Sequence, residues 1–236
     1  MSLARENYLQ LCKKVDERLQ KSSRPPGSAQ ILVVSKGQPA LSLKEMSGWG
    51  QRAFGENYLQ EWRTKKSELQ SILSEKAPRE IQWHFIGRLQ SNKLKYLAGE
   101  ISLFHSLDRW EIALQMNEIS KKRNEVSRVL IEVNLAYEKT KGGISGEELQ
   151  ALIQQMNSLE HLQLQGLMIF PPPCEDPEDS RPYFRQLREI LLEINRKSVY
   201  KESLSELSMG MSNDYLVAIE EGATWLRIGR AIFKQD

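Results

Sequence analysis

The strongest constraint on the fold is an alternation of short apolar segments with longer amphipathic segments. The short segments are rich in β-branched and aromatic residues, as buried strands are, and we expect strands at 31–34, 52–57, 81–87, 101–107, 128–135, 162–170, 204–210 and 225–233. The longer segments space their apolar residues along one face of a helix, and we expect helices at 3–21, 41–48, 58–76, 89–97, 109–123, 146–159, 181–199 and 214–221. Asp108 is the expected N-cap of the helix that ends at Arg123. Strict alternation is typical of a parallel sheet with helical crossovers.

Eight such units fit a closed barrel. The chain has 236 residues, and a (β/α)8 TIM barrel typically takes about 250. We therefore expect an α/β fold in which residues 1–236 form a single (β/α)8 barrel domain preceded by an N-terminal helix. An open, doubly wound sheet is the alternative, and it requires that the weak segments 52–57 and 204–210 are not strands.

The composition restricts the compartment and the possible partners. The 33 basic and 31 acidic residues nearly balance, so nothing indicates a surface for nucleic acid or a membrane. Cys12 and Cys174 lie far apart and have no neighbours at metal-ligand spacing, which favours free thiols in a reducing compartment and no metal site. We find neither a signal peptide nor an apolar run long enough to span a bilayer. We expect a cytoplasmic protein.

Polar residues and glycines gather where the expected strands end. In a (β/α)8 barrel the functional site is built at the carboxyl ends of the strands, and these positions hold Lys36, Asn57, Gly87, Ser106, Asp108, Asn134, Met168, Ser208, Arg227 and Gly229. Lys36 is expected to point inward with Leu32 and Val34, because side chains alternate along a strand. Taken alone, such a lysine fits a side chain that extends to solvent. Partly desolvated, it fits a nucleophile that forms a Schiff base with an aldehyde.

The fifth expected strand places a carboxylate inside the barrel. If Val129 and Ile131 face the helices, Glu132 faces inward. A buried carboxylate needs a cation or a hydrogen-bond donor. We expect an inward-facing cation, His84 or Arg227, to be its partner.

The loops after the last two expected strands have features of a phosphate site. They contain Ser208, Gly210, Ser212, Gly229 and Arg230. Barrels of this kind often bind phosphate at these loops, on backbone N–H groups. Each loop also has an ordinary explanation, in which a side chain at 212–214 caps the next helix and the glycine bends the strand. A lysine at a strand end together with a phosphate site is what pyridoxal phosphate requires, and Arg227 would then meet the pyridine nitrogen.

Seven motifs along nearly the whole chain carry a resemblance to a known family. They are Val33-Val-Ser-Lys36, Phe54-Gly-Glu-Asn-Tyr58, Trp83-His-Phe-Ile-Gly-Arg-Leu-Gln90, His105-Ser-Leu-Asp-Arg109, Gly166-Leu-Met168, Leu207-Ser-Met-Gly-Met-Ser212 and Arg227-Ile-Gly229. With these motifs the sequence resembles the YggS-like family of pyridoxal phosphate homeostasis proteins, relatives of the N-terminal barrel of alanine racemase. The resemblance implies the barrel fold, pyridoxal 5′-phosphate as cofactor and a role in its intracellular homeostasis.

The resemblance also implies roles for individual residues. Lys36 would form the Schiff base, and Arg227 would face the pyridine nitrogen. The other cofactor-binding residues would be Asn57 and Met168 along the pocket, Ser208 and Met209 beside the phosphate, and Ser212, Gly229 and the Arg230 backbone on the phosphate. The sequence departs from the family pattern at Arg230, where a small residue is usual, and at Lys234, which replaces a glycine. The Arg230 side chain either adds to phosphate binding or points to solvent.

Two classes of function are compatible with these features. One is a reversible carrier without turnover, a monomer that meets apo-enzymes only transiently. The other is a pyridoxal-phosphate-dependent amino acid racemase-like enzyme. Two points favour the carrier: an arginine, with a pKa above about 12, does not protonate the pyridine nitrogen, and no segment after the last expected strand forms the β domain of alanine racemase-like enzymes. We assign no catalytic residue. A barrel for another phosphorylated metabolite is a third possibility, and it predicts no aldehyde chemistry.

Overall fold

The computed structural model describes residues 2–72, 81–136 and 142–233, and within them eight parallel strands close into a barrel. The strands are β1 Gln30–Val34, β2 Ala53–Glu56, β3 Gln82–Phe85, β4 Leu103–Leu107, β5 Ser127–Glu132, β6 Leu162–Met168, β7 Glu206–Ser208 and β8 Trp225–Ile228. Each strand pairs with the next along the chain, and β8 pairs with β1. The predicted α/β barrel is confirmed, and the open sheet is excluded.

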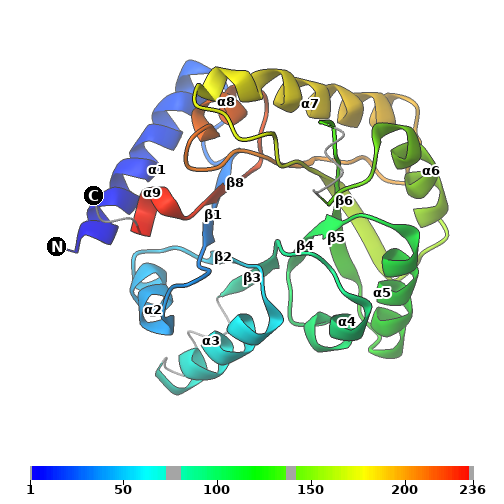
Figure 1. Ribbon diagram of the computed structural model, residues 1–236, viewed down its shortest axis with the longest axis horizontal. Helices are drawn as coiled ribbons and strands as arrows, with labels where there is room; N and C mark the ends of the chain where they lie inside the picture. Colours follow the sequence, from blue (N-terminus) through cyan, green and yellow to red (C-terminus); the bar gives the residue numbers. More distant parts are fainter. Residues whose placement is uncertain (1, 73–80, 137–141, 234–236) are drawn as a thin grey trace.

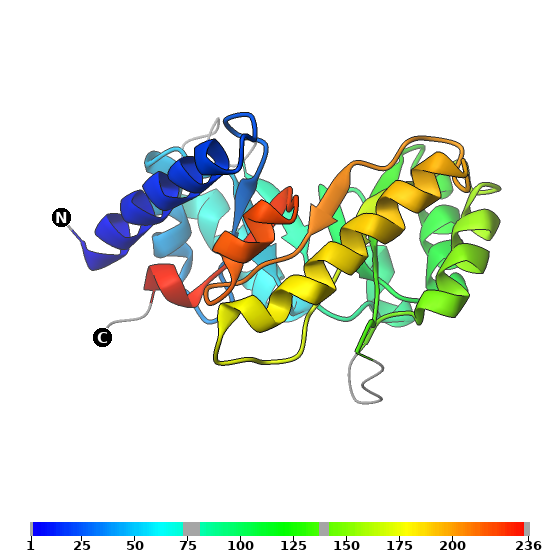
Figure 2. The same cartoon turned by 90° about the horizontal axis from the view of Figure 1, so that it is seen from above.

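Helices surround the barrel, as Figure 1 shows. They are α1 Leu3–Lys21, α2 Ala40–Gly48, α3 Leu59–Ile72, α4 Ser91–Leu97, α5 Trp110–Lys122, α6 Gly146–Met156, α7 Arg181–Arg196, α8 Tyr215–Glu220 and α9 Arg230–Phe233, with a short 3-10 helix η2 Pro177–Ser180 before α7. The N-terminal helix α1 packs against α8 and α9, beside which it lies in Figure 2. In the described part of the chain no helix is both long and apolar enough to cross a membrane.

Apolar side chains form two cores, one between the strands and the helices and one inside the barrel. The inner core consists of Leu32, Ala53, Ile86, Leu103, Leu130, Met168 and Trp225, with Val34 and Phe170 packed against them. Leu32 and Val34 therefore point inward, as predicted. Layers of side chains fill the interior of this fold, so space for a ligand remains at the carboxyl ends of the strands, the mouth of the barrel.

The predicted end of the eighth strand is wrong. β8 ends at Ile228 rather than Phe233, and Arg230–Phe233 form the short helix α9. The reason is the neighbouring strand, because β1 ends at Val34 and offers no further pairing partner. The last N–H groups of α9 donate to Gly229 O instead.

The predicted N-cap of α5 is also wrong. Arg109 occupies the cap position, without a capping bond from its side chain, and Asp108 forms an ion pair with Arg109 instead. Of the helix predicted at 58–76, the described residues form α3, which ends at Ile72. Residues 73–76 lie outside the described ranges.

A β-bulge in β6 requires a glycine. Val129 of β5 pairs with Leu164, but the next residue, Leu130, pairs with Gly166, so β6 contains one extra residue. A Cβ atom on Gly166 would lie 1.9 Å from the carbonyl oxygen of Glu206 in β7. Only a glycine allows this close approach. The bulge thereby sets the level at which β6 reaches the mouth.

Candidate functional site

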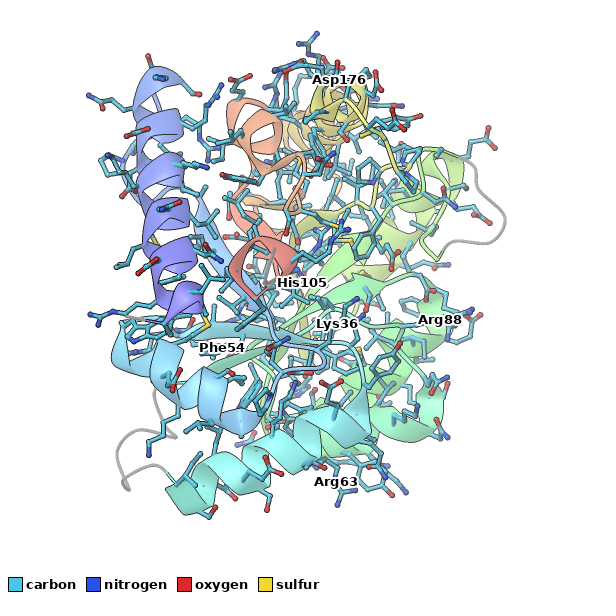
Figure 3. The ribbon with its side chains drawn as sticks, turned by 60° about the vertical axis from the view of Figure 1, so that its left-hand side comes forward. Lys36, Phe54, Arg63, Arg88, His105 and Asp176 are labelled. Atoms are coloured by element: carbon cyan, nitrogen blue, oxygen red, sulfur yellow. The ribbon has the colours of Figure 1, made fainter. Side chains whose placement is uncertain are left out.

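Lys36 lies two residues after the end of β1, in a turn at the mouth of the barrel (Figure 3). The Gln38 N–H closes this turn by donating to Ser35 O over 3.0 Å. Gly37 has a φ of +74°, a value that glycine adopts without strain. The side chain of Lys36 is exposed, so its amine is accessible to a ligand at the mouth.

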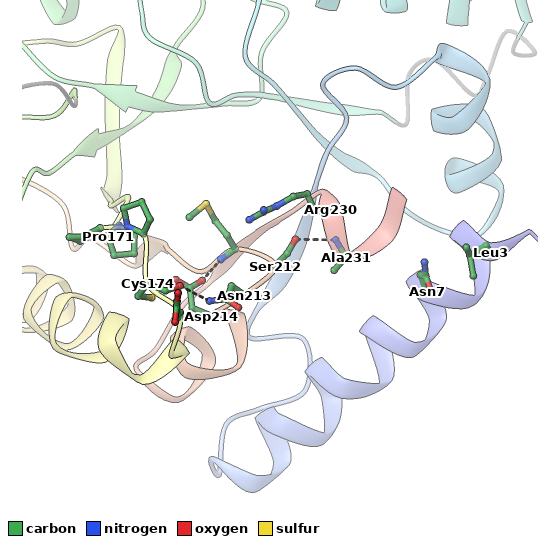
Figure 4. A pocket seen from close by; sticks show the side chains of 13 residues that line it. Leu3, Asn7, Pro171, Cys174, Ser212, Asn213, Asp214, Arg230 and Ala231 are labelled. Atoms are coloured by element: carbon green, nitrogen blue, oxygen red, sulfur yellow. Dashed lines mark hydrogen bonds between the residues drawn. The ribbon is translucent and has the colours of Figure 1, made fainter. Parts of the chain in front are cut away.

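A cavity of about 840 Å³ opens beside the loops that follow β7 and β8 (Figure 4). Its lining includes Met211, Ser212, Arg230 and Ala231. The Ala231 N–H donates to Ser212 Oγ over 3.1 Å, so the loop after β7 meets the start of α9 at the cavity wall. Figure 4 shows the Arg230 side chain beside this bond. The structure therefore brings two of the predicted phosphate residues together, whereas Lys234 lies outside the described ranges.

Asp214 holds the loop that precedes α8. Its Oδ1 accepts a bond from the Met211 N–H over 2.7 Å, and its Oδ2 accepts one from Ser180 Oγ over 2.9 Å. Asp214 stands at the N-cap position of α8, but its side chain makes no capping bond. The alternative explanation, in which a side chain at 212–214 caps α8, is therefore wrong. The side chains of this segment instead form hydrogen bonds within the loop and to Ser180 and Ala231.

Arg227 is a buried cation on the inward face of β8. Its NH1 group donates to Ser208 O and Oγ over 2.6 and 2.8 Å, and its NH2 group donates to Ile169 O over 2.7 Å. The guanidinium carbon lies 4.3 Å from the centre of the Phe170 ring. Burial lowers the pKa of Arg227 to about 10, so the group stays charged at neutral pH. Its Nε–H is buried and has no partner among the described residues.

A chain of hydrogen bonds connects Arg227 to two histidines inside the barrel. His105 Nδ1 lies 2.8 Å from Ser208 Oγ, and His105 Nε2 lies 2.9 Å from His84 Nδ1. Burial lowers the pKa of His84 to about 3 and that of His105 well below its ordinary value, so both rings are neutral at pH 7. No group of three or more metal-binding side chains occurs in the part of the chain that the structure describes. The sequence interpretation missed this pairing, and its signal is one histidine on each of two adjacent strands.

Glu132 faces inward, as predicted. It follows Leu130, an inner-core residue, by two positions on β5, and it lines a second cavity of about 300 Å³ together with Phe170. Burial and the nearby Asp108 raise the pKa of Glu132 to about 7, against the opposing charges of Arg227 and Arg88. Glu132 is therefore partly protonated at neutral pH.

The partner predicted for Glu132 is only partly right. Arg227 acts on Glu132 through its charge, whereas its guanidinium donates hydrogen bonds to the Ser208 hydroxyl and to the carbonyls of Ser208 and Ile169. His84 bonds to another histidine and is neutral, so it is not the cation that was expected.

Replacing Glu132 by glutamine is expected to stabilise the protein at pH 8 and to change little near pH 4. The folded protein keeps the Glu132 proton up to a pKa of about 7, whereas the unfolded chain loses it near 4.5. Between these values the folded state binds more protons, so the contribution of Glu132 to the free energy of unfolding falls as pH rises. Glutamine removes that loss, a gain of about 2 kcal/mol at pH 8 after allowance for solvent screening. Urea unfolding of both proteins at the two pH values measures it, and a pH-independent difference would contradict this role.

Comparisons with known proteins identify the family of this chain. A sequence model of the family described as "Alanine racemase, N-terminal domain" matches residues 17–236. The chain is 42% identical over 228 residues to the pyridoxal phosphate homeostasis protein of Aquifex aeolicus, covering 97% of this chain and 96% of that protein. The chain belongs to the alanine racemase N-terminal domain family. The pyridoxal phosphate homeostasis protein of Pseudomonas aeruginosa is 39% identical, covering 99% of this chain and 96% of that protein.

Two solved structures, one 33% and one 15% identical in sequence, show the same barrel. PipY of Synechococcus elongatus, solved with pyridoxal phosphate (PLP) bound, has a TM-score of 0.80 at 33% identity, covering 93% of this chain and 100% of that one. An alanine racemase of Clostridium difficile has a TM-score of 0.71 at 15% identity, covering 99% of this chain but 56% of that one. The second likeness shows the fold alone.

The remaining residues predicted from the family resemblance divide between the mouth and the core. Asn57 follows β2, and its Oδ1 is buried without a partner among the described residues. Met168 belongs to the inner core, whereas Met209 is buried in the outer core. A Cβ on Gly229 would lie 3.1 Å from Val34 O, which keeps the exit of β8 close to that of β1.

Proposed function

We propose that this chain binds pyridoxal 5′-phosphate and serves its intracellular homeostasis, holding the cofactor reversibly without turnover of its own. The observation that carries the proposal is the buried Arg227 guanidinium, whose Nε–H lacks a partner among the described residues. Buried donors without acceptors are uncommon, and a pyridine nitrogen is an acceptor of the kind that this group lacks. The printed names of the relatives and the PLP bound to PipY support the same ligand.

Residues on both sides of the mouth fit the remaining parts of the cofactor. Arg227 would donate to the pyridine nitrogen and keep its own proton, because its pKa of about 10 lies far above that of a pyridine. Ser212, Gly229 and Arg230 would hold the phosphate where the loop after β7 meets the start of α9. The other pocket residues in this proposal are Asn57, Met168, Ser208 and Met209.

Lys36 would hold the cofactor covalently. PLP supplies an aldehyde, whose carbon forms a C=N bond with Lys36 Nζ while the aldehyde oxygen leaves as water. The exposed amine of Lys36 is accessible for this reaction. Hydrolysis reverses the bond, and reversibility is what a carrier needs.

Incubation with PLP followed by borohydride is expected to attach one phosphopyridoxyl group to the protein, at Lys36. Lys36→Ala should abolish the labelling, because it removes the amine that is proposed to react with the aldehyde. Lys44→Ala, at an exposed lysine on α2, is the matched control and should label normally. Absorbance spectra and peptide mass spectrometry measure the result. Unchanged labelling of Lys36→Ala, or a protein that takes up no PLP, would contradict the proposal.

A racemase-like activity is the second candidate, and the match to the alanine racemase N-terminal domain family favours it. The carrier is favoured by the two histidines in the barrel, because burial lowers the pKa of each and makes it a poor proton acceptor. Exchange of the α-proton of free amino acids in D2O, dependent on Lys36, would support the enzyme instead.

The proposal extends to the organisation of the protein. Residues 1–236 would act as one barrel domain, a cytoplasmic monomer that passes PLP to apo-enzymes through transient contacts. The near balance of charge and the two cysteines support this setting. Light scattering tests the monomer, and cell fractionation tests the compartment.

A further inference from the structure

A buried lysine lies next to the turn that carries Lys36. Lys65, on α3, is 4% exposed, although a charged ammonium group is costly to bury. Its Nζ donates to Ser35 O over 2.5 Å and to Glu56 Oε1 and Glu61 Oε1 over 2.7 Å each. These three bonds use every donor of the ammonium group. Its charge is therefore fully compensated.

The hydrogen bonds of this network reach both neighbours of Lys36. Ser35 precedes it, and the Ser35 hydroxyl also donates to Glu56 Oε1 over 2.6 Å. Gly37 follows it, and the Gly37 N–H donates to the same oxygen of Glu61 that the ammonium group contacts. One buried cation thus fixes both neighbours of Lys36 to β2 and α3, while the Lys36 side chain itself stays exposed.

Stability alone does not account for this network. Glu56 is 0% exposed, and burial raises its pKa against the opposing effect of Lys65 and Ser35. The second carboxylate oxygen of Glu56 has no partner among the described residues. Replacing a buried ion pair by apolar side chains of similar size is often neutral or stabilising, because the charges no longer have to be desolvated.

We propose that Lys65 is a positioning residue for Lys36. It fixes the turn at 35–37, so that the Lys36 amine is held at the mouth in the orientation that an incoming aldehyde needs. The inference rests on the proposed function, since it concerns the bond between Lys36 and PLP. Displacing a reacting group by about 1 Å can slow a reaction on the order of 100-fold, so a clamp of this kind has a measurable effect.

The test compares Lys65→Met with the unsubstituted protein in two backgrounds. With Lys36 present, borohydride trapping and mass spectrometry measure the rate of bond formation with PLP, which is expected to fall on the order of 100-fold. With Lys36→Ala, equilibrium dialysis measures non-covalent binding of PLP, which Lys65→Met is expected to leave unchanged. Lys66→Met is the matched control, because the ammonium group of Lys66 pairs with Glu100 at the surface, and it should react normally.

Two further variants separate positioning from a folding defect. Lys65→Met combined with Glu56→Gln removes both buried charges, and it is expected to be as slow as Lys65→Met alone. Glu61→Ala, at a side chain 26% exposed, breaks the link to Gly37 and keeps the Lys65–Glu56 pair. It should fold normally and react about tenfold more slowly.

The possible outcomes are distinct. Normal rates in both Lys65→Met and Glu61→Ala would overturn the inference, and so would an equal loss of non-covalent binding in the Lys36→Ala background, since that loss indicates a general structural role. Absence of any adduct on the unsubstituted protein would overturn the proposed function and this inference with it. A slow reaction with intact non-covalent binding supports the inference.

Discussion

Arg227→Met is expected to weaken PLP binding by between ten- and a hundredfold, roughly the value of one hydrogen bond from a charged group, about 1.5–3 kcal/mol. The substitution removes the Nε–H, the donor without a partner among the described residues. It also leaves Ile169 O without the NH2 group that donates to it, which should lower the free energy of unfolding by about 1–3 kcal/mol. The loss of affinity should remain after Lys36→Ala, because Arg227 acts on the ring and not on the covalent bond.

Equilibrium dialysis in the Lys36→Ala background measures this effect separately from the covalent bond. Arg230→Met is compared with it, because the exposed Arg230 side chain lies at the edge of the cavity. A much smaller loss from Arg230→Met would mean that the phosphate contacts its backbone. Equal affinities of Arg227→Met and the unsubstituted protein would remove the main support for the proposed function.

Gly166→Ala is expected to lower the free energy of unfolding by about 3 kcal/mol or more. The added Cβ would lie 1.9 Å from Glu206 O and 2.6 Å from the carbonyl carbon of the same residue. Both atoms belong to the backbone of a barrel strand, so relief requires β6 and β7 to move apart. The hydrogen bonds between these strands would weaken with the contact.

Urea unfolding followed by circular dichroism measures this loss. Gly48→Ala is the matched control, since Gly48 is in α2 and its Cβ would meet no atom within 4 Å. Alanine is the better helix former by about 1 kcal/mol, so the control should be unchanged or slightly more stable. If both variants unfolded at the same urea concentration, the close approach at Gly166 would be refuted.

The order of strands and helices was predictable because it depends on local patterns. Strands such as β1 contain a short apolar run, and the inward direction of Leu32 and Val34 follows from alternation alone. The end of β8 was not predictable in the same way. The apolar residues of Arg230–Phe233 fit a strand, but pairing stops where the neighbouring strand stops, and that is a property of two segments far apart in the sequence.

The residues of the candidate site also differ in whether the local sequence could predict them. Lys36 and Arg227 could be selected from the sequence because they stand at strand ends and interrupt apolar runs. The role of Lys65 could not, because a lysine in a charged helix usually faces solvent. Only the fold brings it to Glu56 and Ser35. A glutamate within a short apolar strand was the one signal that a buried cation had to be nearby.

The hydrogen-bond chain inside the barrel determines how a buried charge is tolerated there. Arg227 can only donate, so Ser208 Oγ accepts a hydrogen bond from it, and the Ser208 hydroxyl in turn donates a hydrogen bond to His105 Nδ1. His105 consequently carries its proton on Nε2, and this N–H donates a hydrogen bond to His84 Nδ1. In this sequence of bonds the negative end of every dipole points back toward the guanidinium. Three neutral side chains thus stabilise the buried charge of Arg227 through their aligned dipoles. A carboxylate usually stabilises a buried cation instead.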